Sequence, residues 1–465
     1  MSLPSPPAAP TATAGPVPRA CLVVLAVSAV LRLALALGTD VYFDTAYYWQ
    51  WARHLAWGYY DHPPLAAWLV AVLGIHATAL VCGALTVAAV WGLARDVYGD
   101  SAAAWRAAAL WSVVPVGMVA GVWATPDSPL LLFWTLGLWA LWRERWVWAG
   151  LACGLALLSK YPAVLLGLAF LLASARARRL PWGAWLTGAL AVLCFVPVVL
   201  WNSRHEWVGF LFQLRHGFKG WGGWNTFGEF LGGQLAIGGP VLFPLALVYA
   251  VRGPREQFLL RMAAVVPLLF FGYAATRARG EANWPETAYV AACVGVAGMR
   301  PAWRRAVTVS GLAVVLAVGS HVFFPVVRAE RDRLLWRIRG WNVLRELATP
   351  EKLFPGMDAK NVAAIYAPSY QLASHVAYYT GAVTDTGASP RFSQYDLWPD
   401  PVIAPGQDVL WVGEGGPPPP DDLAARFTAV EGPVELAGDF RDRRVHTFLV
   451  WRLRALKPTG DNVTP

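Results

Sequence analysis

The chain has 465 residues, of which 57% are hydrophobic and only 14% are charged, and its mean hydropathy is +0.43. Soluble globular domains carry about 25% charged residues, so the composition excludes an ordinary soluble protein. The net charge of +9 does not indicate a nucleic-acid partner, because many arginines lie in short segments between apolar runs, where arginines orient membrane spans.

The N-terminal residues 1–18 are rich in Pro, Ala and Thr, which predicts a disordered tail. The apolar run from Cys21 to Leu37 follows. One Arg precedes this run and no clear cleavage site follows it, so we interpret it as an uncleaved first span and not as a signal peptide. All five cysteines lie inside apolar runs, which argues against a disulfide framework or a cysteine metal site.

Further apolar runs recur down to about residue 325. They approach the length that crosses a bilayer, so residues 19–327 are predicted to form an all-α polytopic membrane domain with roughly eleven transmembrane helices. The runs after the first are Leu65–Leu73, Ala77–Ala94, Ala102–Ala124, Leu130–Trp142, Val147–Leu158, Ala163–Ala173, Trp182–Leu200, Leu231–Val251, Phe258–Ala275, Thr287–Met299 and Ala306–Val326.

The distribution of arginines predicts the orientation of these spans. If the N-terminus is cytoplasmic, the arginine-rich loops all fall on the inner side, as the positive-inside rule requires. The polar loops then fall together on the outer side, and so does the C-terminal domain. These outer loops are Thr39–Pro64, Thr125–Pro129, Ser159–Pro162, Trp201–Gly228 and Arg277–Glu286.

The character of the sequence changes near Arg328. Residues 361–366, 409–412 and 448–451 have the composition of strands, and residues 369–379 that of a helix. We therefore predict a small α/β domain over residues 328–465, with exposed aromatic residues such as Tyr395 and Trp398.

Ionisable and polar residues gather in the outer loops. Such residues are costly at the ends of spans unless they serve a site or a water-filled cavity, so this cluster is the predicted functional site. It comprises Asp44, Tyr60, Asp61, His62, Asp127, Ser159, Lys160, Tyr161, Asn202, Arg204, His205, Glu206, Glu281, Asn283, Trp284 and Glu286.

Several stretches resemble a known family in the right order along most of the chain. They are DTAYYWQWARHLAWGYYDHPPLAAWL (44–69), TPDSPLLLFW (125–134), GLALLSKYPAVLL (154–166), PVVLWNSRHEWVGFLFQ (197–213), EANWPETAY (281–289) and QYDLWP (394–399). The chain resembles the bacterial dolichyl-phosphate-mannose–protein mannosyltransferase-like glycosyltransferases, to which the lipid A aminoarabinose transferases are related.

This resemblance implies a GT-C fold in the bacterial inner membrane, with the active site on the periplasmic side. It also implies an inverting transfer of a sugar from a polyprenyl-phosphate donor to a lipid, glycan or protein acceptor, without a metal or other cofactor. The family's acidic residue in the first outer loop matches Asp44. The family usually has Asp-Glu there, whereas this chain has Asp44-Thr45. Thr45 therefore cannot perform a role that requires the carboxylate of the family's Glu.

The chemistry of such a transfer assigns roles to the remaining residues. A carboxylate such as Asp44 can remove the acceptor proton as the new bond forms. The leaving phosphate needs cations, for which Lys160 and Arg204 are the best candidates, with Arg277 and Arg279 as alternates. The sugar and acceptor pocket is then expected to comprise Tyr60, Asp61, His62, Asp127, Tyr161, His205, Glu281, Asn283 and Trp284.

Each of these residues also has a structural explanation. Asp44 and Asp127 could cap helices, Asp61 and His62 could mark a turn, and Lys160 could extend to the membrane interface. The aromatic residues of the first outer loop favour an amphipathic helix at the membrane surface over a sugar-binding platform.

Two other functions remain open at this stage. A transporter of a lipid-linked saccharide would show broken helices in paired halves. A non-catalytic membrane binding protein would keep the cluster but lack turnover.

Overall fold

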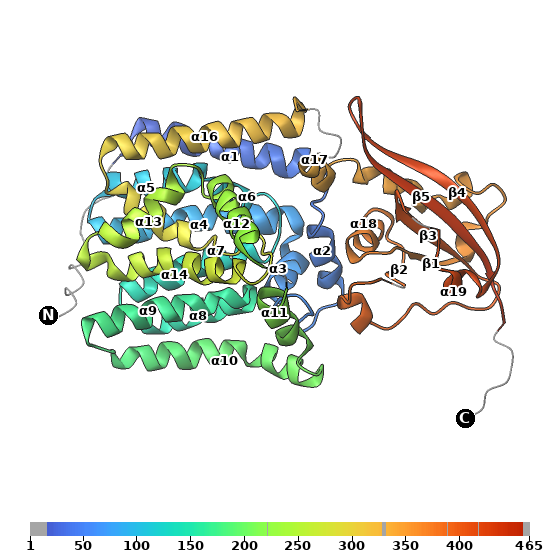
Figure 1. Cartoon of the computed structure of the whole chain (residues 1–465), viewed down its shortest axis with the longest axis horizontal. Helices are drawn as coiled ribbons and strands as arrows, with labels where there is room; N and C mark the ends of the chain where they lie inside the picture. Colours follow the sequence, from blue (N-terminus) through green and yellow to red (C-terminus); the bar gives the residue numbers. More distant parts are fainter. Residues whose placement is uncertain (1–15, 221, 328–331, 388, 417, 459–465) are drawn as a thin grey trace. The chain divides into compact units, whose positions relative to one another are not determined.

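The structure, a computed structural model, describes residues 16–220, 222–327, 332–387, 389–416 and 418–458. Most of the predicted tail of residues 1–18 therefore lies outside the described residues. The chain divides into two compact units (Figure 1). The first comprises residues up to Gly38 and Leu55–Phe324, and the second comprises Thr39–His54 and the residues from Pro325 onward. The first predicted outer loop is thus shared between the two units.

The first unit is built from helices. Their bounds are α1 (Arg19–Gly38), α3 (Leu65–Leu73), α4 (Ile75–Tyr98), α5 (Ser101–Val113), α6 (Pro115–Val119), α7 (Asp127–Trp142), α8 (Trp146–Ser159), α9 (Val164–Ala177), α10 (Trp182–Arg204), α11 (Val208–Phe218), α12 (Trp224–Ile237), α13 (Leu242–Arg252), α14 (Phe258–Ala275), α15 (Ala288–Ala297) and α16 (Pro301–Phe323).

Among the described residues, five helical segments are long and apolar enough to cross a membrane: α1, α4, α10, α16 and Arg255–Ala275. The pair α12 and α13 would make a sixth span, but its two parts are bent by 100°. The bend follows the sequence Gly238-Gly239-Pro240, in which Gly239 has a φ of +88° that favours glycine. The number of eleven spans therefore stays a prediction.

The run Ala102–Ala124 is also interrupted. Val114 has extended backbone angles directly before Pro115, which begins α6. Proline disfavours the helical conformation of the residue before it and has no N–H for the helical ladder, so α5 ends here.

Large apolar side chains point outward from several of these helices. Only 11% of the most apolar 18-residue stretch of α10 is buried. Its side chains Trp182, Val192 and Leu193 are 86%, 65% and 66% exposed. Water would leave such a surface unfavourably solvated, whereas lipid chains would cover it. The exposed surface therefore favours a bilayer around the first unit.

Helix α15 is the buried centre of the first unit. All ten of its residues are fully buried, and it packs against α5, α13 and α14. Its small residues allow this close approach: a side chain at Gly295 would collide with the ring of Tyr249 on α13. Because α15 is held on all sides, the segment directly before it, which carries Glu286, is also fixed.

The second unit contains a five-stranded mixed sheet. The strand order is β2-β1-β3-β5-β4, in which β1 pairs in parallel with β2 and β3, and β5 pairs antiparallel with β3 and β4. The elements are β1 (Val362–Tyr366), β2 (Thr384–Asp385), β3 (Asp408–Glu414), β4 (Phe427–Phe440), β5 (Arg443–Leu456), α2 (Thr45–Arg53), α17 (Arg333–Ile338), α18 (Tyr370–Thr380) and α19 (Asp421–Ala424).

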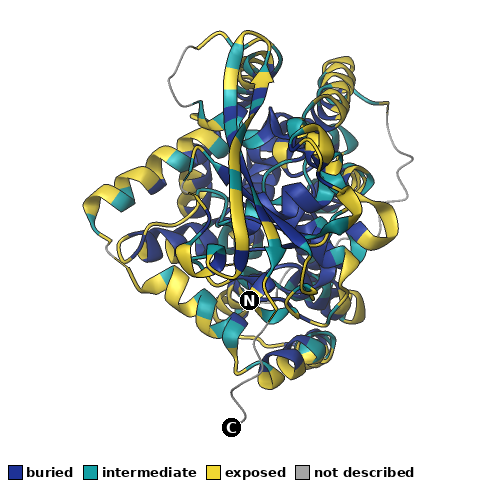
Figure 2. Ribbon diagram, turned by 90° about the vertical axis from the view of Figure 1, so that its right-hand side faces the viewer, coloured by how far each residue is buried: buried dark blue, intermediate teal, exposed yellow. Residues whose placement is uncertain are grey.

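The predicted C-terminal sheet is confirmed. The predicted strands at 361–366, 409–412 and 448–451 are β1, β3 and the centre of β5, and the predicted helix is α18. The edge strand β4 was not predicted, because Gly432, Pro433 and its charged residues hide the alternating pattern, and much of it is exposed (Figure 2). The expectation that Tyr395 is exposed is wrong: its side chain is buried and within hydrogen-bond distance of Ser374.

Helix α2 packs within the second unit. The Tyr47 ring lies 4.4 Å from that of Tyr370, and the Trp49 ring lies 5.1 Å from that of Tyr378 on α18. The Tyr47 hydroxyl also accepts a 2.7 Å hydrogen bond from the Gln394 amide. The interpretation of this aromatic segment as a membrane-surface helix is therefore wrong, because its rings form part of the interior of a folded unit.

The close approach of Gly83 on α4 to Gly121 makes a testable prediction. A Cβ at position 83 would lie 2.6 Å from the Gly121 Cα, which is backbone and cannot rotate away. We expect Gly83→Ala to cost about 1–3 kcal/mol and to lower the Tm of the purified protein in detergent. Gly188→Ala on α10 is the control, because nothing lies within 4 Å of its Cβ. Equal Tm values for the two variants would contradict the packing of α4.

Candidate active site

A buried ion pair joins the ends of two neighbouring helices in the first unit. Asp127 is the first residue of α7, and Lys160 directly follows the last residue of α8. Since α7 and α8 pack together, these ends meet, and the Lys160 Nζ lies 2.5 Å from the Asp127 Oδ1. The side chains are only 8% and 12% exposed. Each charge also sits at the helix end that stabilises it, the carboxylate at an N-terminus and the ammonium at a C-terminus.

The segment before α15 adds two polar groups to this pair. The Asn283 Nδ2 donates a 2.7 Å hydrogen bond to the Asp127 Oδ2, and the Thr125 hydroxyl lies 3.4 Å from the same oxygen. Glu286, which is 2% exposed, lies close enough to Asp127 and Lys160 for an electrostatic interaction with both. We call Asp127, Lys160, Asn283 and Glu286 the buried polar cluster.

Glu286 holds its proton in this cluster. Burial raises the pKa of its carboxyl well above the usual range, and the negative charge of Asp127 raises it further, against an opposing effect of Lys160. The protonated acid can donate to Asp127, which leaves one carboxylate facing one ammonium ion. Removing either charge would leave the other buried without compensation.

The structure confirms that three predicted loops meet, since Thr125–Pro129, Ser159–Pro162 and Arg277–Glu286 supply the cluster. Glu286 belonged to the polar set of the sequence but received no role. Its burial could have been predicted from the sequence, because Glu286 is the last acid before a fully apolar run. When the helix formed by that run is buried, the residue next to its first turn is buried as well.

Other predicted pocket residues also make contacts within the first unit. The Tyr60 ring lies 4.5 Å from Phe212, and the Asp61 carbonyl accepts a hydrogen bond of 2.5 Å from Gln213. His62 is close enough to Asp127 for an electrostatic interaction. The Tyr161 and Trp284 rings pack against neighbouring aromatic rings at 5.4 and 5.5 Å.

Four predicted residues form no hydrogen bond or ion pair with the cluster in the interactions described, although Glu281 acts electrostatically on Lys160. The Arg277 guanidinium contacts the Tyr273 hydroxyl at 3.2 Å, and the His205 Nδ1 lies 2.8 Å from the Trp201 carbonyl. Arg204 and Glu281 are exposed. The interactions described for these four side chains do not include a hydrogen bond or ion pair to the buried polar cluster, so a role for Arg204 or Arg277 at the donor phosphate remains a prediction.

Asp44 belongs to the second unit, not to the unit of the cluster. It stands at the N-cap position of α2, half-buried, and its side chain makes no capping hydrogen bond to that helix. The capping explanation is therefore wrong for Asp44. Thr45, at the position where the family usually has Glu, is buried. The catalytic role of Asp44 stays a prediction.

No group of three or more His, Cys, Asp or Glu residues in the described part of the chain is arranged to hold a metal ion. The buried polar cluster instead combines a cation, a carboxylate, a carboxylic acid and an amide. Such a set can bind an anion through Lys160 while Asp127 fixes the lysine in place.

Comparisons with known proteins agree with the resemblance. Residues 61–201, which include Asp127 and Lys160, match the family described as dolichyl-phosphate-mannose-protein mannosyltransferase. Lipid A galacturonosyltransferase RgtD of Rhizobium johnstonii is 28% identical over 347 residues, which cover 65% of this chain and 71% of that protein.

The fold matches two crystal structures of ArnT from Cupriavidus metallidurans, each with a TM-score of 0.59. The apo structure is 16% identical and covers 94% of this chain, and the structure bound to undecaprenyl phosphate is 15% identical and covers 96%. Both alignments cover 99% of the ArnT chain. Together the matches confirm the resemblance to GT-C membrane glycosyltransferases.

The buried ion pair makes a prediction about stability. Asp127→Asn and Lys160→Met each leave one buried charge unpaired, so each should lose about 3–5 kcal/mol. The double variant should lose less than the sum, because it leaves no charge behind. Thermal unfolding in detergent measures all three. The control is Arg279→Met, which breaks a pair with Glu229 that is 70% and 52% exposed and should change stability little. Additive losses would contradict the pairing.

Glu286 makes a prediction about pH. Its raised pKa means that the folded state keeps a proton that the unfolded state has released, so stability should fall as pH rises above the ordinary glutamate pKa of about 4.3 toward the raised value. Glu286→Gln cannot release a proton, so its stability should fall less over this range. Unfolding measured from pH 4 upward tests this, and parallel curves for the two proteins would contradict it.

Proposed function

We propose that this chain, a relative of the GT-C membrane glycosyltransferases, moves a sugar from a polyprenyl-phosphate donor to a lipid, glycan or protein acceptor outside the cytoplasm. It would do so as a multi-pass protein of a bacterial inner membrane and without a cofactor. Lipid A is the first acceptor to test, because the curated relative is a lipid A galacturonosyltransferase.

The donor class is supported by the relatives. The matched family is named for a polyprenyl-phosphate sugar, and one matched structure holds undecaprenyl phosphate. The exposed apolar faces of α1 and α10 would let a lipid-linked donor reach the protein from the bilayer. The sugar is open, and a galacturonosyl donor is the first to try.

The buried polar cluster is the observation that carries the proposal. In the transfer, the acceptor oxygen bonds to the anomeric carbon, the bond from that carbon to the phosphate oxygen breaks, and the polyprenyl phosphate leaves with the electron pair. Lys160 would stabilise the charge that develops on this phosphate, and its low exposure makes the interaction strong. Asp127 accepts from Lys160 and Asn283 and so would orient the ammonium group.

The acceptor hydroxyl must lose its proton as the new bond forms. We assign this step to Asp44, which matches the acidic residue of the family's first outer loop. Arg204 and Arg277 would add positive charge for the donor phosphate. The pocket for the sugar and acceptor would comprise Tyr60, Asp61, His62, Asp127, Tyr161, His205, Glu281, Asn283 and Trp284.

The transporter alternative has one feature in its favour. The bent pair α12 and α13 resembles the broken helices of transporters. Transporters place such breaks at corresponding positions in two repeated halves, whereas this pair is the one bent pair found in the described part of the chain. This single bent pair therefore favours transfer over transport, and a measurement of turnover separates transfer from binding alone.

The direct test uses the purified protein in nanodiscs with a panel of polyprenyl-phosphate sugars and lipid A. We expect Asp44→Asn to lose at least about 10²-fold in transfer rate while it still binds undecaprenyl phosphate, because the base is lost but not the phosphate site. Lys160→Met should weaken that binding as well, once folding of the variant is checked by its Tm. Asp422→Asn, an exposed acid of the second unit, is the control.

Donor binding without transfer by any of the four proteins would favour the transport or binding function. Equal transfer by the wild type and Asp44→Asn would retain the enzyme but remove Asp44 as its base.

A further inference from the structure

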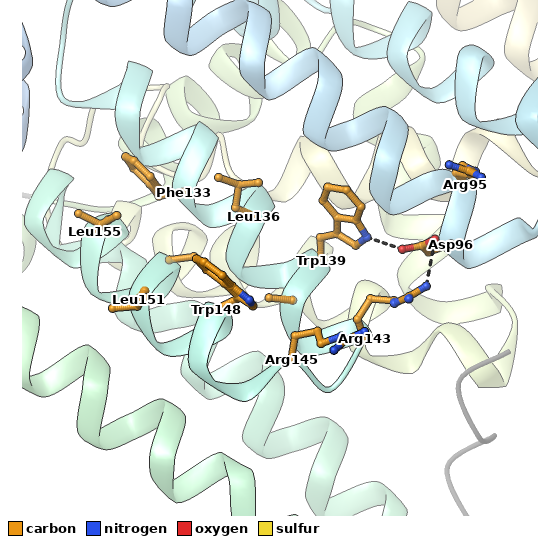
Figure 3. Close-up of a pocket in the computed structure, with 12 residues that line it drawn as sticks. Arg95, Asp96, Phe133, Leu136, Trp139, Arg143, Arg145, Trp148, Leu151 and Leu155 are labelled. Carbon is orange, nitrogen blue, oxygen red and sulfur yellow. Dashed lines mark hydrogen bonds and ion pairs between the residues drawn. The ribbon is translucent and has the colours of Figure 1, made fainter. Parts of the chain in front are cut away.

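The first unit contains a second site of a different kind. A cavity of about 630 Å³ lies between the C-terminal part of α4, α7 from Phe133 onward and α8 up to Leu155 (Figure 3). This volume is within the range of small-molecule sites in proteins. Arginines in the short loop between α7 and α8 also agree with the positive-inside rule.

The cationic end of this cavity lies away from the buried polar cluster. Asp127 begins α7 and Arg143 directly follows its last residue, so the 16 residues of the helix separate them by about 24 Å at 1.5 Å per residue. In the same way, α8 separates Arg145 from Lys160. The arginine end of the cavity is therefore far from the cluster, whereas its apolar end, at Phe133 and Leu155, lies within two helical turns of Asp127 and Lys160.

One end of the cavity is apolar. Figure 3 shows Phe133, Leu136, Leu151 and Leu155 on the side away from the arginines. Trp148 is 68% exposed and Leu151 is 36% exposed, so the cavity is open along α8. An apolar opening on the flank of a membrane helix faces lipid chains and not water.

The other end of the cavity is cationic. Arg95, Arg143 and Arg145 line it together with one acid, Asp96. Asp96 is already engaged, because its carboxylate accepts from the Trp139 Nε1 at 2.6 Å and lies 3.3 Å from the Arg143 guanidinium. The lining therefore has an excess of positive charge, and Arg145 is exposed at the mouth.

The turn between α7 and α8 holds two of these arginines at the mouth. Glu144 has a φ of +52°, and the amides of Arg143, Glu144 and Arg145 donate back to carbonyls of the last turn of α7. This is the hydrogen-bonding pattern of a helix C-terminus closed by a left-handed residue, and it fixes the backbone on both sides of Glu144.

From this arrangement we propose that the cavity binds an anionic diacyl phospholipid. Its phosphate would contact Arg95 and Arg145, and one acyl chain would lie on Phe133, Leu136 and Leu155. The charge selects an anionic headgroup over a zwitterionic one, and the apolar half selects a lipid over free phosphate. This binding is independent of sugar transfer and of the proposed active site.

The test measures lipid retained by the purified full-length protein. Wild type is titrated with phosphatidylglycerol and with phosphatidylcholine and analysed by native mass spectrometry and thermal shift. We expect stronger binding and a larger rise in Tm with phosphatidylglycerol. The double variant Arg95→Gln/Arg145→Gln should bind it roughly 30-fold more weakly, because two cationic contacts are lost. Leu136→Trp should also weaken binding, by filling the apolar end without changing the charge.

The matched control is Arg179→Gln, an exposed arginine just beyond the C-terminal end of α9 that does not line the cavity. It should bind phosphatidylglycerol as the wild type does. Equal binding of both lipids, or equal weakening by Arg179→Gln, would overturn the proposal. In a further contrary outcome, undecaprenyl phosphate displaces phosphatidylglycerol from the wild type, and the double variant binds neither lipid. That result would overturn the assignment of a diacyl phospholipid. Because phospholipid binding is measured without a sugar donor, it can fail or succeed independently of the transferase test.

Discussion

The ion pair between Asp127 and Lys160 is the constraint on which the first unit's polar interior depends. Two charges that are nearly excluded from solvent are tolerable only when they face each other and their remaining hydrogen-bonding groups are satisfied. Asn283 supplies one such hydrogen bond, and burial beside Asp127 raises the pKa of Glu286, which favours a neutral acid next to the pair. The pair therefore determines where the segment before α15 must lie, and α15 in turn holds that segment by its complete burial.

The same two helices carry opposite chemistry at their two ends. At one end, α7 and α8 present the buried polar cluster, in which each cation has a defined partner. At the other end they present Arg143, which is half-buried and paired with Asp96, and the exposed Arg145, beside a cavity whose lining carries more positive than negative charge. A buried, compensated site suits a reaction that must control water and charge. An open site with net positive charge suits reversible binding of an anionic amphiphile.

The division of the first outer loop has a physical basis as well. Residues 39–54 carry a high density of aromatic rings, and these rings find partners on α18 and around Gln394 in the second unit. From Leu55 onward the chain belongs to the first unit, where Tyr60 and Asp61 contact residues of α11. Asp44 and the buried polar cluster are thus positioned by separately packed interiors, so a substitution in one interior is expected to leave the other's internal contacts intact.

The sequence by itself determined the membrane character, the family resemblance and the C-terminal sheet, because apolar runs, motif order and strand composition are local properties. It also indicated that Asp127, Lys160 and Asn283 meet, since loop polarity and arginine distribution assign loops to sides of a membrane. Only the tertiary structure decided that Glu286 is buried against Asp127, that residues 39–54 join the C-terminal residues, and that α12 and α13 bend apart. These outcomes depend on which helix ends lie together and on which aromatic rings pack against each other. Both depend on contacts between residues that are far apart in the chain.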